Sequence, residues 1–378
     1  MMLTHMVPTE GESRRPGEIP PPPPGRRPSK RLALLITSLV LAIVGAEAAV
    51  RLLRLGPPVY APHRFEPGGG IPFTRIENGP IVYQPNTVFC SVYDPAGDTR
   101  GYLGPDGRIK YEINQYGMRG PALPVEKTPG AYRIICLGDS ITFGEGVRYA
   151  DTYPARMADL LGAAMPGRRV EVINAGVQAY GTKDEAAFFL LRCLRFQPDV
   201  VTLGFFLNDA TAYAETIRQN EAMTRDLDLS LPARISRIWE IIERRGRTAA
   251  LQEEYFEAIR RGFQSSEWAD CREVLKGLQQ VGREDRFRLI VVLFPVLWEL
   301  DGSYPFQDIH ARIAEACRAA GCEFIDLLPA YRGRCAEDLW VHPTDQHPNE
   351  VAHGLAAKAI VDYLTSREPP GAQPPPSR

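Results

Sequence analysis

The sequence predicts an α/β fold in which helices cover both faces of a five-stranded parallel sheet. Two patterns carry this prediction. After residue 133, short runs rich in β-branched residues alternate with segments of helical periodicity, which is typical of a parallel sheet buried on both sides. Before residue 57, one long apolar run predicts a membrane-spanning helix ahead of that sheet. The 378 residues carry 44 Lys and Arg against 46 Asp and Glu, and this near balance argues against a nucleic-acid-binding protein.

The N-terminal part divides into a Pro-rich tail and an apolar helix. Residues 1–31 hold an unbroken proline run at Pro20–Pro24 and show no hydrophobic periodicity, so we expect a disordered cytoplasmic tail. Residues 32–53 are predicted to be a transmembrane anchor, because residues 32–50 contain one charged side chain, Glu47, over a length that crosses a bilayer. The arginines and lysines before it favour a cytoplasmic N-terminus, with the rest of the chain on the other side of the plasma membrane.

Two other interpretations of this apolar helix stay open. Residues 46–48, Ala-Glu-Ala, have the small-x-small form of a signal-peptide cleavage site, which predicts a secreted protein. The other interpretation is a buried helix in a soluble core. Its hydrophobicity on all sides, directly after a basic cluster, argues against that one.

The seven cysteines would lie outside the cytoplasm in this topology, where disulfides persist. Cys136 falls within a predicted buried strand and is expected to be a core residue. Cys317, Cys322 and Cys335 are close enough in sequence to offer one bridge. No C-x-x-C pair occurs, so the sequence supports neither a zinc ribbon nor a thioredoxin-type site.

Between the two ends, residue composition and hydrophobic periodicity separate two regions. Residues 57–130 predict a small β-rich region, because they are dense in Gly, Pro, Asn and Tyr and contain short alternating pieces such as 109–114. Residues 131–366 carry the alternation of strands and helices. Its five predicted strands are residues 133–137, 170–175, 199–205, 289–294 and 323–327. Residues 367–378 are Pro-rich again and are expected to form a disordered tail.

A long spacer, residues 208–287, separates the third and fourth predicted strands and is interpreted as a helical insertion and a candidate lid. It contains an apolar stripe at helical spacing, flanked by arginines; its members are Ile235, Ile238, Trp239 and Ile242. A helix lying on a membrane surface is one interpretation of this pattern. A helix packed on the domain, with its arginines in water, is favoured because such stripes ordinarily indicate amphipathic packing.

A serine directly follows the first predicted strand. Ser140 lies in LGDSITFGEGV, residues 137–147, where the strand ends and a helix is expected to begin. Open α/β sheets bind their ligands at this edge, and the free N–H groups of a helix N-terminus can stabilise an oxyanion. Serine is also a common N-cap and Gly-Asp a common turn. The catalytic interpretation therefore requires a base elsewhere in the chain.

His347 is the candidate base. It precedes Pro348 on a predicted loop just before the last helix. An imidazole activates a serine hydroxyl by taking its proton, and a carboxylate fixes the tautomer of that imidazole. Asp345 is two residues earlier, and residues i and i+2 of an extended chain point to the same side. The three residue types therefore predict a Ser-His-Asp triad.

Four segments together resemble the blocks of the SGNH (GDSL-type) hydrolase superfamily, over about residues 133–365. They are Gly138-Asp139-Ser140, INAGVQAYGT at 173–182, FLND at 206–209 and Asp345-Gln346-His347-Pro348-Asn349. This resemblance implies a flavodoxin-like three-layer α/β/α sandwich with Ser140 as nucleophile. It also implies an oxyanion hole formed by the N–H groups of Ser140 and Gly176 and the side chain of Asn208. With EINQYGMRGP at 112–121, the chain further resembles a membrane-anchored bacterial group of this superfamily.

Two positions depart from the family pattern. The last block is usually D-x-x-H, but Thr344 stands three residues before His347 and the acid is shifted to Asp345. A D-x-H arrangement is similar to that of some polysaccharide O-acetyltransferases. In the third block, Phe206 replaces the usual glycine, which would change the shape of the pocket.

The resemblance implies a serine esterase acting on acyl, in particular acetyl, esters of carbohydrate in a bacterial cell envelope, with no cofactor. An O-acyltransferase with the same triad is the first alternative. A metal-dependent hydrolase is the second, since imidazole and carboxylate groups suit zinc and cluster near the C-terminus; its candidate ligands are His342, Asp345, His347 and His353. Of these, His342 and His353 are rather expected at the surface or against the last helix. The third alternative is a non-catalytic, membrane-tethered glycan-binding module.

Overall fold

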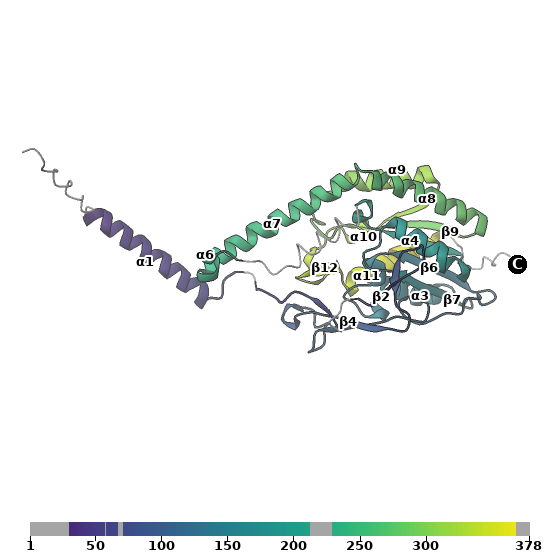
Figure 1. Ribbon diagram of the computed structural model, residues 1–378, viewed down its shortest axis with the longest axis horizontal. Coiled ribbons are helices and arrows are strands. Elements are labelled where there is room, and N and C mark those ends of the chain that lie inside the picture. The colour runs from purple at the N-terminus through teal and green to yellow at the C-terminus, as the bar shows by residue number, and fades with distance from the viewer. Residues whose placement is uncertain (1–29, 57, 67–70, 212–228, 368–378) are drawn as a thin grey trace, which may run out of the picture. The chain divides into compact units, whose positions relative to one another are not determined.

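The computed structural model describes residues 30–56, 58–66, 71–211 and 229–367 (Figure 1). The tails predicted to be disordered therefore lie almost wholly outside the described residues. The chain divides into two compact units. One comprises the described residues of Met1–Gly56 together with Leu231–Ile241, and the other holds the remainder of the chain.

A five-stranded parallel sheet, in the order β10-β9-β8-β6-β7, forms the centre of the larger unit. Its strands are β6 (Tyr132–Gly138), β7 (Val170–Gly176), β8 (Val200–Phe205), β9 (Arg288–Leu293) and β10 (Glu323–Asp326). β6 and β8 are buried along their whole length, because their apolar side chains meet helices on both faces. All five strands predicted from the sequence are confirmed.

Helices cover both faces of this sheet. α3 (Tyr153–Ala164) packs with α11 (Glu350–Arg367), whereas α8 (Ser266–Asp285) packs with α4 (Thr182–Phe188) and α9 (Gln307–Ala320). Figure 1 shows α8 and α9 above the strands of the sheet. The predicted three-layer α/β/α sandwich is therefore confirmed. Two short helices, α2 (Ser140–Phe143) and α10 (Leu328–Tyr331), follow β6 and β10.

The β-rich segment expected before the sandwich is present and belongs to the same compact unit. β4 (Val88–Val92) lies between β1 (Arg64–Glu66) and β5 (Arg108–Glu112), and β2 (Phe73–Arg75) pairs with β3 (Ile81–Tyr83). Tyr83 and Tyr111 place their rings 4.9 and 5.1 Å from the ring of Phe143 in α2. The segment therefore shares a core with the helix that carries Ser140.

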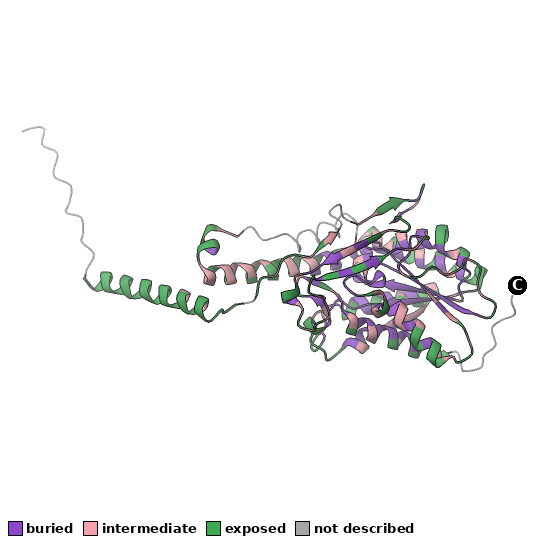
Figure 2. Cartoon of the chain, turned by 90° about the horizontal axis from the view of Figure 1, so that it is seen from below, coloured by how far each residue is buried: buried purple, intermediate pink, exposed green. Residues whose placement is uncertain are grey.

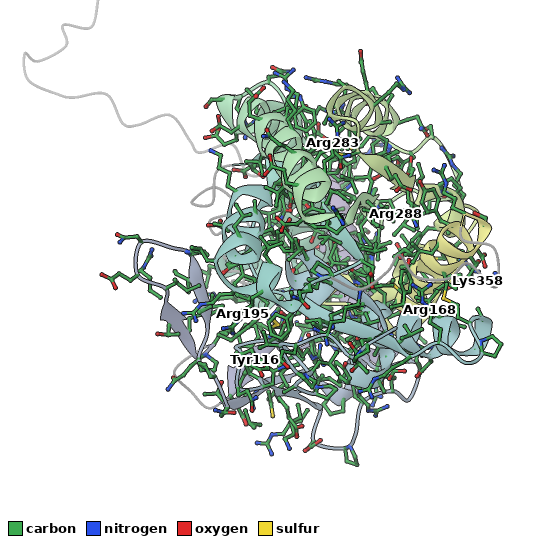
Figure 3. All side chains as sticks on the ribbon, turned by 90° about the vertical axis from the view of Figure 1, so that its right-hand side faces the viewer. Tyr116, Arg168, Arg195, Arg283, Arg288 and Lys358 are labelled. Atoms are coloured by element: carbon green, nitrogen blue, oxygen red, sulfur yellow. The ribbon has the colours of Figure 1, made fainter. Side chains whose placement is uncertain are left out.

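A second contact joins this segment to the sandwich at the surface (Figure 3). The ring of Tyr116 meets Phe196 edge-on with centroids 5.1 Å apart, and the Arg195 guanidinium lies 5.5 Å from the Tyr116 ring centroid. Close by in sequence, Arg119 forms an antiparallel bridge with Asn174 of β7. The ring contacts with residues 195 and 196 and the backbone bridge to β7 together anchor the segment to the sandwich.

The smaller unit contains α1 (Lys30–Leu52), α6 (Leu231–Ile235) and the first residues of α7 (Arg237–Gly262). By length and composition α1 is able to cross a membrane, and none of its residues is buried (Figure 2). A helix of this kind is compatible with a membrane anchor or a signal peptide. The alternative of a helix buried in a soluble core is wrong for the chain as described.

The apolar stripe of the predicted insertion differs from expectation. Ile235, Trp239 and Ile242 are 66%, 49% and 56% exposed, so these three side chains are not core residues. Ile235 and Trp239 belong to the smaller unit. α8, in contrast, buries Trp268 and Leu275 and forms the ordinary crossover between β8 and β9. The insertion additional to the fold is therefore shorter than residues 208–287, and residues 212–228 of it lie outside the described residues.

The expected disulfide is absent, since all seven cysteines are described and free. Their side chains face different surroundings. Cys317 is fully buried in α9, the Cys322 thiol lies 3.7 Å from the carbonyl oxygen of Leu275, and exposed Cys335 donates a hydrogen bond to Glu337. Cys136 is a buried core residue of β6, as predicted.

A buried ion pair closes the amino end of the sheet. Arg133 in β6 is fully buried, and its Nε and Nη2 lie 2.8 and 2.7 Å from the Glu171 carboxylate in β7, whose side chain is 2% exposed. The guanidinium also donates to the carbonyl oxygens of Val125 and Phe196. A buried charge needs such partners because desolvation is costly.

We expect Arg133→Met to lower the free energy of unfolding by about 3–5 kcal/mol, because it leaves a buried carboxylate and two carbonyls without their main partner. Arg169 contacts the same carboxylate at 2.9 Å but is 60% exposed, so Arg169→Met should cost at most about 1 kcal/mol. Urea unfolding followed by circular dichroism measures both. Equal losses for the two variants would show that the buried ion pair contributes no more to the free energy of unfolding than the exposed one.

Candidate active site

Ser140 begins helix α2 directly after β6. The Asp139 carboxylate caps this helix by accepting a hydrogen bond from the Ile141 N–H at 2.8 Å. Gly138 has a φ of 154°, and a Cβ on it would lie 1.9 Å from Oγ1 of Thr142. Glycine and the cap thus set a sharp strand-to-helix turn that presents Ser140 at the carboxyl edge of the sheet, where open α/β sheets bind ligands.

His347 and Asp345 come from a short hairpin before the last helix, in which β12 (Asp345–Pro348) pairs with β11 (Trp340–His342). The His347 Nε2 is 2.8 Å from the Ser140 Oγ. Its Nδ1 is 2.5 Å from the Asp345 Oδ1, which also accepts the backbone N–H of His347. The i, i+2 spacing of a strand places both side chains on one side. The three residues predicted from the sequence are therefore joined in one hydrogen-bonded chain.

Tyr93, next to the carboxyl end of β4, holds the second oxygen of this carboxylate. Its hydroxyl donates to Oδ2 of Asp345 at 2.7 Å, and both side chains are buried. Burial alone would raise the pKa of Asp345, but the neighbouring His347 and the Tyr93 hydroxyl outweigh burial and hold that pKa well below its usual range. The role of Tyr93 is not evident from the sequence, because 252 positions separate it from Asp345.

The pKa of His347 moves in the opposite direction. Burial lowers it, but the ionised Asp345 beside the ring outweighs burial and raises the pKa of His347 to about 9. The imidazolium form is therefore stabilised, which is the form the ring takes after it accepts the serine proton.

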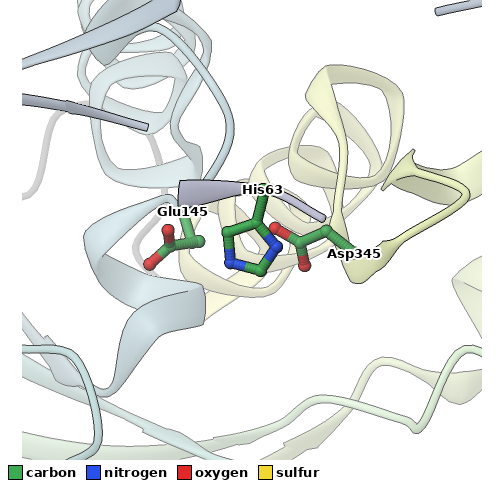
Figure 4. Close-up of side chains that lie close together, drawn as sticks. All are labelled: His63, Glu145 and Asp345. Atoms are coloured by element: carbon green, nitrogen blue, oxygen red, sulfur yellow. The ribbon is translucent and has the colours of Figure 1, made fainter. Parts of the chain in front are cut away.

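Two further side chains surround Asp345 (Figure 4). His63, Glu145 and Asp345 each place a potential ligand atom within 4.8 Å of the others. Ser91 donates to Glu145 at 3.0 Å, and the ring of His63 stacks on Tyr93 with centroids 5.5 Å apart. Burial raises the pKa of Glu145, which favours its neutral form. A second carboxyl can therefore lie beside the ionised Asp345 with less repulsion between the two groups.

The cluster has the ligand types of a metal site, but its geometry favours support of Asp345. Both oxygens of Asp345 already accept hydrogen bonds, from His347 and from Tyr93. A cation bound to this carboxylate would compete with the contact that orients the imidazole. Two of the four metal ligands considered from the sequence, His342 and His353, also have other hydrogen-bond partners. His342 bonds to Thr344 and to the carbonyl of Asp94, and His353 Nδ1 accepts the N–H of Tyr153.

Neither of these two histidines lies at the surface, contrary to expectation for His342. Both are about 1% exposed. Burial lowers the pKa of His353 to about 3, so this ring stays neutral as a contact between α11 and the start of α3. They are core histidines with their own partners.

Gly176, which the family resemblance places in the oxyanion hole, has a partner for its N–H and lies close to α2. Its N–H donates to Oδ1 of Asn174 at 3.0 Å and is therefore engaged within its own strand. A Cβ at this position would lie 2.2 Å from the backbone nitrogen of Phe143. Glycine is needed here so that β7 can approach the backbone of α2, and the N–H is not free to bind an oxyanion.

Two other segments follow strands of the sheet near Ser140. Asn208 follows β8 in the short helix η5 (Leu207–Ala210), and its buried side-chain oxygen has no hydrogen-bond partner among the described residues. After β7, residues 177–180 form a turn closed by the Tyr180 N–H on the Val177 carbonyl, with Ala179 at a φ of 62°. A non-glycine residue in this conformation is strained. Phe206, which replaces the family glycine, is half-buried and packs against the core.

Residues 136–355 match the GDSL-like Lipase/Acylhydrolase family. The chain therefore belongs to this family, and it is a hydrolase of ester bonds. Among curated proteins no match is found.

Solved structures of esterases resemble the chain at low identity. A two-domain esterase active on acetylated mannans is 18% identical with a TM-score of 0.40, over 66% of this chain and 54% of the other. The chain thus spans about half the length of that esterase. An acetylxylan esterase from Geobacillus stearothermophilus is 18% identical with a TM-score of 0.41, over 62% of this chain and 95% of the other. The acetyl xylan esterase AlAXEase is 15% identical with a TM-score of 0.40, over 61% and 99%.

We expect Tyr93→Phe to lower kcat about 10-fold while leaving the melting temperature nearly unchanged, because only the hydroxyl that holds Asp345 is lost. Hydrolysis of p-nitrophenyl acetate by the full chain measures kcat. Tyr363→Phe is the matched control, since its hydroxyl bonds to Glu323 on a distant part of the sandwich. A kcat equal to that of the control would remove Tyr93 from the support of the site.

The raised pKa of His347 predicts the pH profile. A general base works only when neutral, so kcat/KM should rise about tenfold per pH unit and level off near pH 9. Asp345→Asn should move the bend toward the ordinary histidine value of about 6.5, at much lower activity. The same shift stabilises the fold below pH 6.5, and this contribution is lost as the pH rises through 9. A profile that bends at the same pH in both enzymes would contradict this origin.

Proposed function

We propose that the chain is a serine esterase in which Ser140 is the nucleophile, His347 the general base and Asp345 the residue that orients His347. The observation that carries the proposal is the continuous hydrogen-bonded chain from Ser140 Oγ through His347 to Asp345. Ser140 attacks the ester carbonyl, His347 takes the serine proton and returns it to the leaving alcohol, and water then releases the acyl group by the same steps in reverse.

The oxyanion hole is proposed to consist of the Ser140 N–H, the Asn208 side-chain amide and the Ala179 N–H. Ser140 is the first residue of α2, so its N–H is one of the unpaired donors of a helix N-terminus. Asn208 lies in η5 directly after β8, and Ala179 lies in the turn after β7 with a φ of 62°. All three follow the carboxyl ends of adjacent strands β6, β8 and β7. Ala179 takes the place that the sequence analysis gave to Gly176. Donors of this kind contribute about 3 kcal/mol each.

The substrate class is proposed from the family and from α1. With α1 as an uncleaved anchor and the positive flank in the cytoplasm, the esterase would face the cell envelope, and the proposed substrate there is O-acetylated carbohydrate. A sugar hydroxyl in place of water would give an O-acyltransferase by the same steps. The predicted role of part of residues 208–287 as a lid stays a prediction.

The test compares the full chain in detergent with Ser140→Ala on p-nitrophenyl acetate and on acetylated xylo-oligosaccharide, with and without EDTA. We expect Ser140→Ala to lose at least about 10³-fold in kcat and EDTA to have no effect. Ser366→Ala, an exposed serine at the end of α11, is the control for serine removal. Activity that survives Ser140→Ala but vanishes with EDTA would overturn the proposal in favour of a metal-dependent hydrolase.

Mass spectrometry of the same reactions separates the two acyl acceptors. Free acetate as the product supports an esterase. Acetyl groups moved to an added unacetylated oligosaccharide, with little free acetate, would assign the triad to an O-acyltransferase instead.

A further inference from the structure

The smaller unit contains a carboxylate in an otherwise apolar helix. Glu47 lies within α1, whose large apolar side chains are exposed, as in Leu34 at 67% and Leu41 at 66%. A charged group in a membrane-spanning helix is costly and calls for partners. Glu47 is five residues before the last residue of α1, so it lies about 7.5 Å from that end of the helix.

The partners of Glu47 lie at the start of α7. Its Oε1 accepts the N–H of Arg237 at 2.7 Å, and its Oε2 accepts the Ser236 hydroxyl at 2.9 Å and the N–H of Ile238 at 3.2 Å. These N–H groups have no partner within their own helix. Glu47 therefore caps α7 from another segment of the chain, and the helix N-terminus compensates its charge.

Arg51 fixes the adjoining helix in the same way. It donates to Glu47 at 2.6 Å and to the carbonyl oxygen of Ile235, the last residue of α6, at 2.5 Å. Glu47 and Arg51 are one helical turn apart, so they act from one face of α1. The junction between α6 and α7 is thereby held against the final turns of the apolar helix.

This junction exposes an apolar face. Leu231, Ile235 and Trp239 are 70%, 66% and 49% exposed. Leu231 and Ile235 lie one turn apart in α6, and Trp239 lies in the first turn of α7. The last residues of α1 are exposed too, with Leu52 at 83%. Residues 231–247 carry five arginines against two glutamates, which gives the segment a positive charge suited to anionic phospholipid headgroups.

We propose that the face formed by Leu231, Ile235 and Trp239 lies in the boundary between headgroups and acyl chains of the same bilayer that α1 enters. The inference rests on the proposed anchor and adds a second membrane contact to it. Two observations select lipid as the occupant. The face is continuous with the apolar end of α1 through Glu47 and Arg51, and it combines a tryptophan with neighbouring arginines, the pairing found at membrane interfaces.

Quenching of tryptophan fluorescence tests the proposal in the full chain. The protein is reconstituted into vesicles of phosphatidylethanolamine and phosphatidylglycerol, with or without lipid that carries bromines on its acyl chains. Bromine quenches only nearby tryptophans. We expect Trp239→Phe to lose at least half of the quenching seen in the wild type. Trp298→Phe is the matched control, because Trp298 stacks on Trp340 in the larger unit and should retain that quenching.

Alkaline extraction of the same vesicles separates the two proposals. A chain that stays with the vesicles while Trp239 is not quenched keeps its anchor and overturns the interfacial face. A chain released by alkali overturns both. If the face is covered by a second copy instead, Trp239 will escape quenching and Ile235→Ser will convert a dimer to a monomer in detergent, which again overturns the lipid assignment.

Discussion

The position of the nucleophile depends on Arg119, a buried cation that holds α2 from its far end. Its guanidinium donates to the carbonyl oxygens of Phe143, Gly144 and Val147 at 2.6 Å, and it lies over the rings of Tyr111 and Phe143. The carbonyls of Phe143 and Gly144 end a helix of four residues, too short to be stable alone, and that of Val147 lies in the turn that follows. A cation at the carboxyl end and the Asp139 cap at the amino end therefore fix Ser140 between them.

Arg119 also explains why the β-rich segment cannot be separated from the site. The segment supplies the cation that completes α2, the rings that pack on Phe143 and the hydroxyl that binds Asp345. Two of the three members of the hydrogen-bonded chain are therefore positioned by residues that precede the sandwich. The sheet sets the direction of Ser140, while the segment sets the distances that join it to the imidazole and the carboxylate.

The sequence predicts the sandwich well and its supports poorly, for physical reasons. Strands such as β6 are buried on both faces, so a continuous apolar run in the sequence is enough to predict them. Ser140 and His347 lie where a strand ends and a helix begins, which local sequence reveals. The role of Gly176 is hard to predict from sequence, because the need for space beside Phe143 and the need for a free N–H both select glycine. The stripe at Ile235 and Trp239 shows an apolar face by its spacing, but spacing says nothing about what covers that face.

The family match begins at residue 136, well after Tyr93 and Arg119. A gene fragment cut at the borders of the match would carry the serine, the histidine and the aspartate. It would lack Tyr93, whose hydroxyl binds Asp345, and Arg119, whose guanidinium binds the end of α2. The unit that can be inherited, exchanged between genes or transplanted as a working catalyst is thus longer than the unit that family comparison recognises, and its hidden part lies upstream.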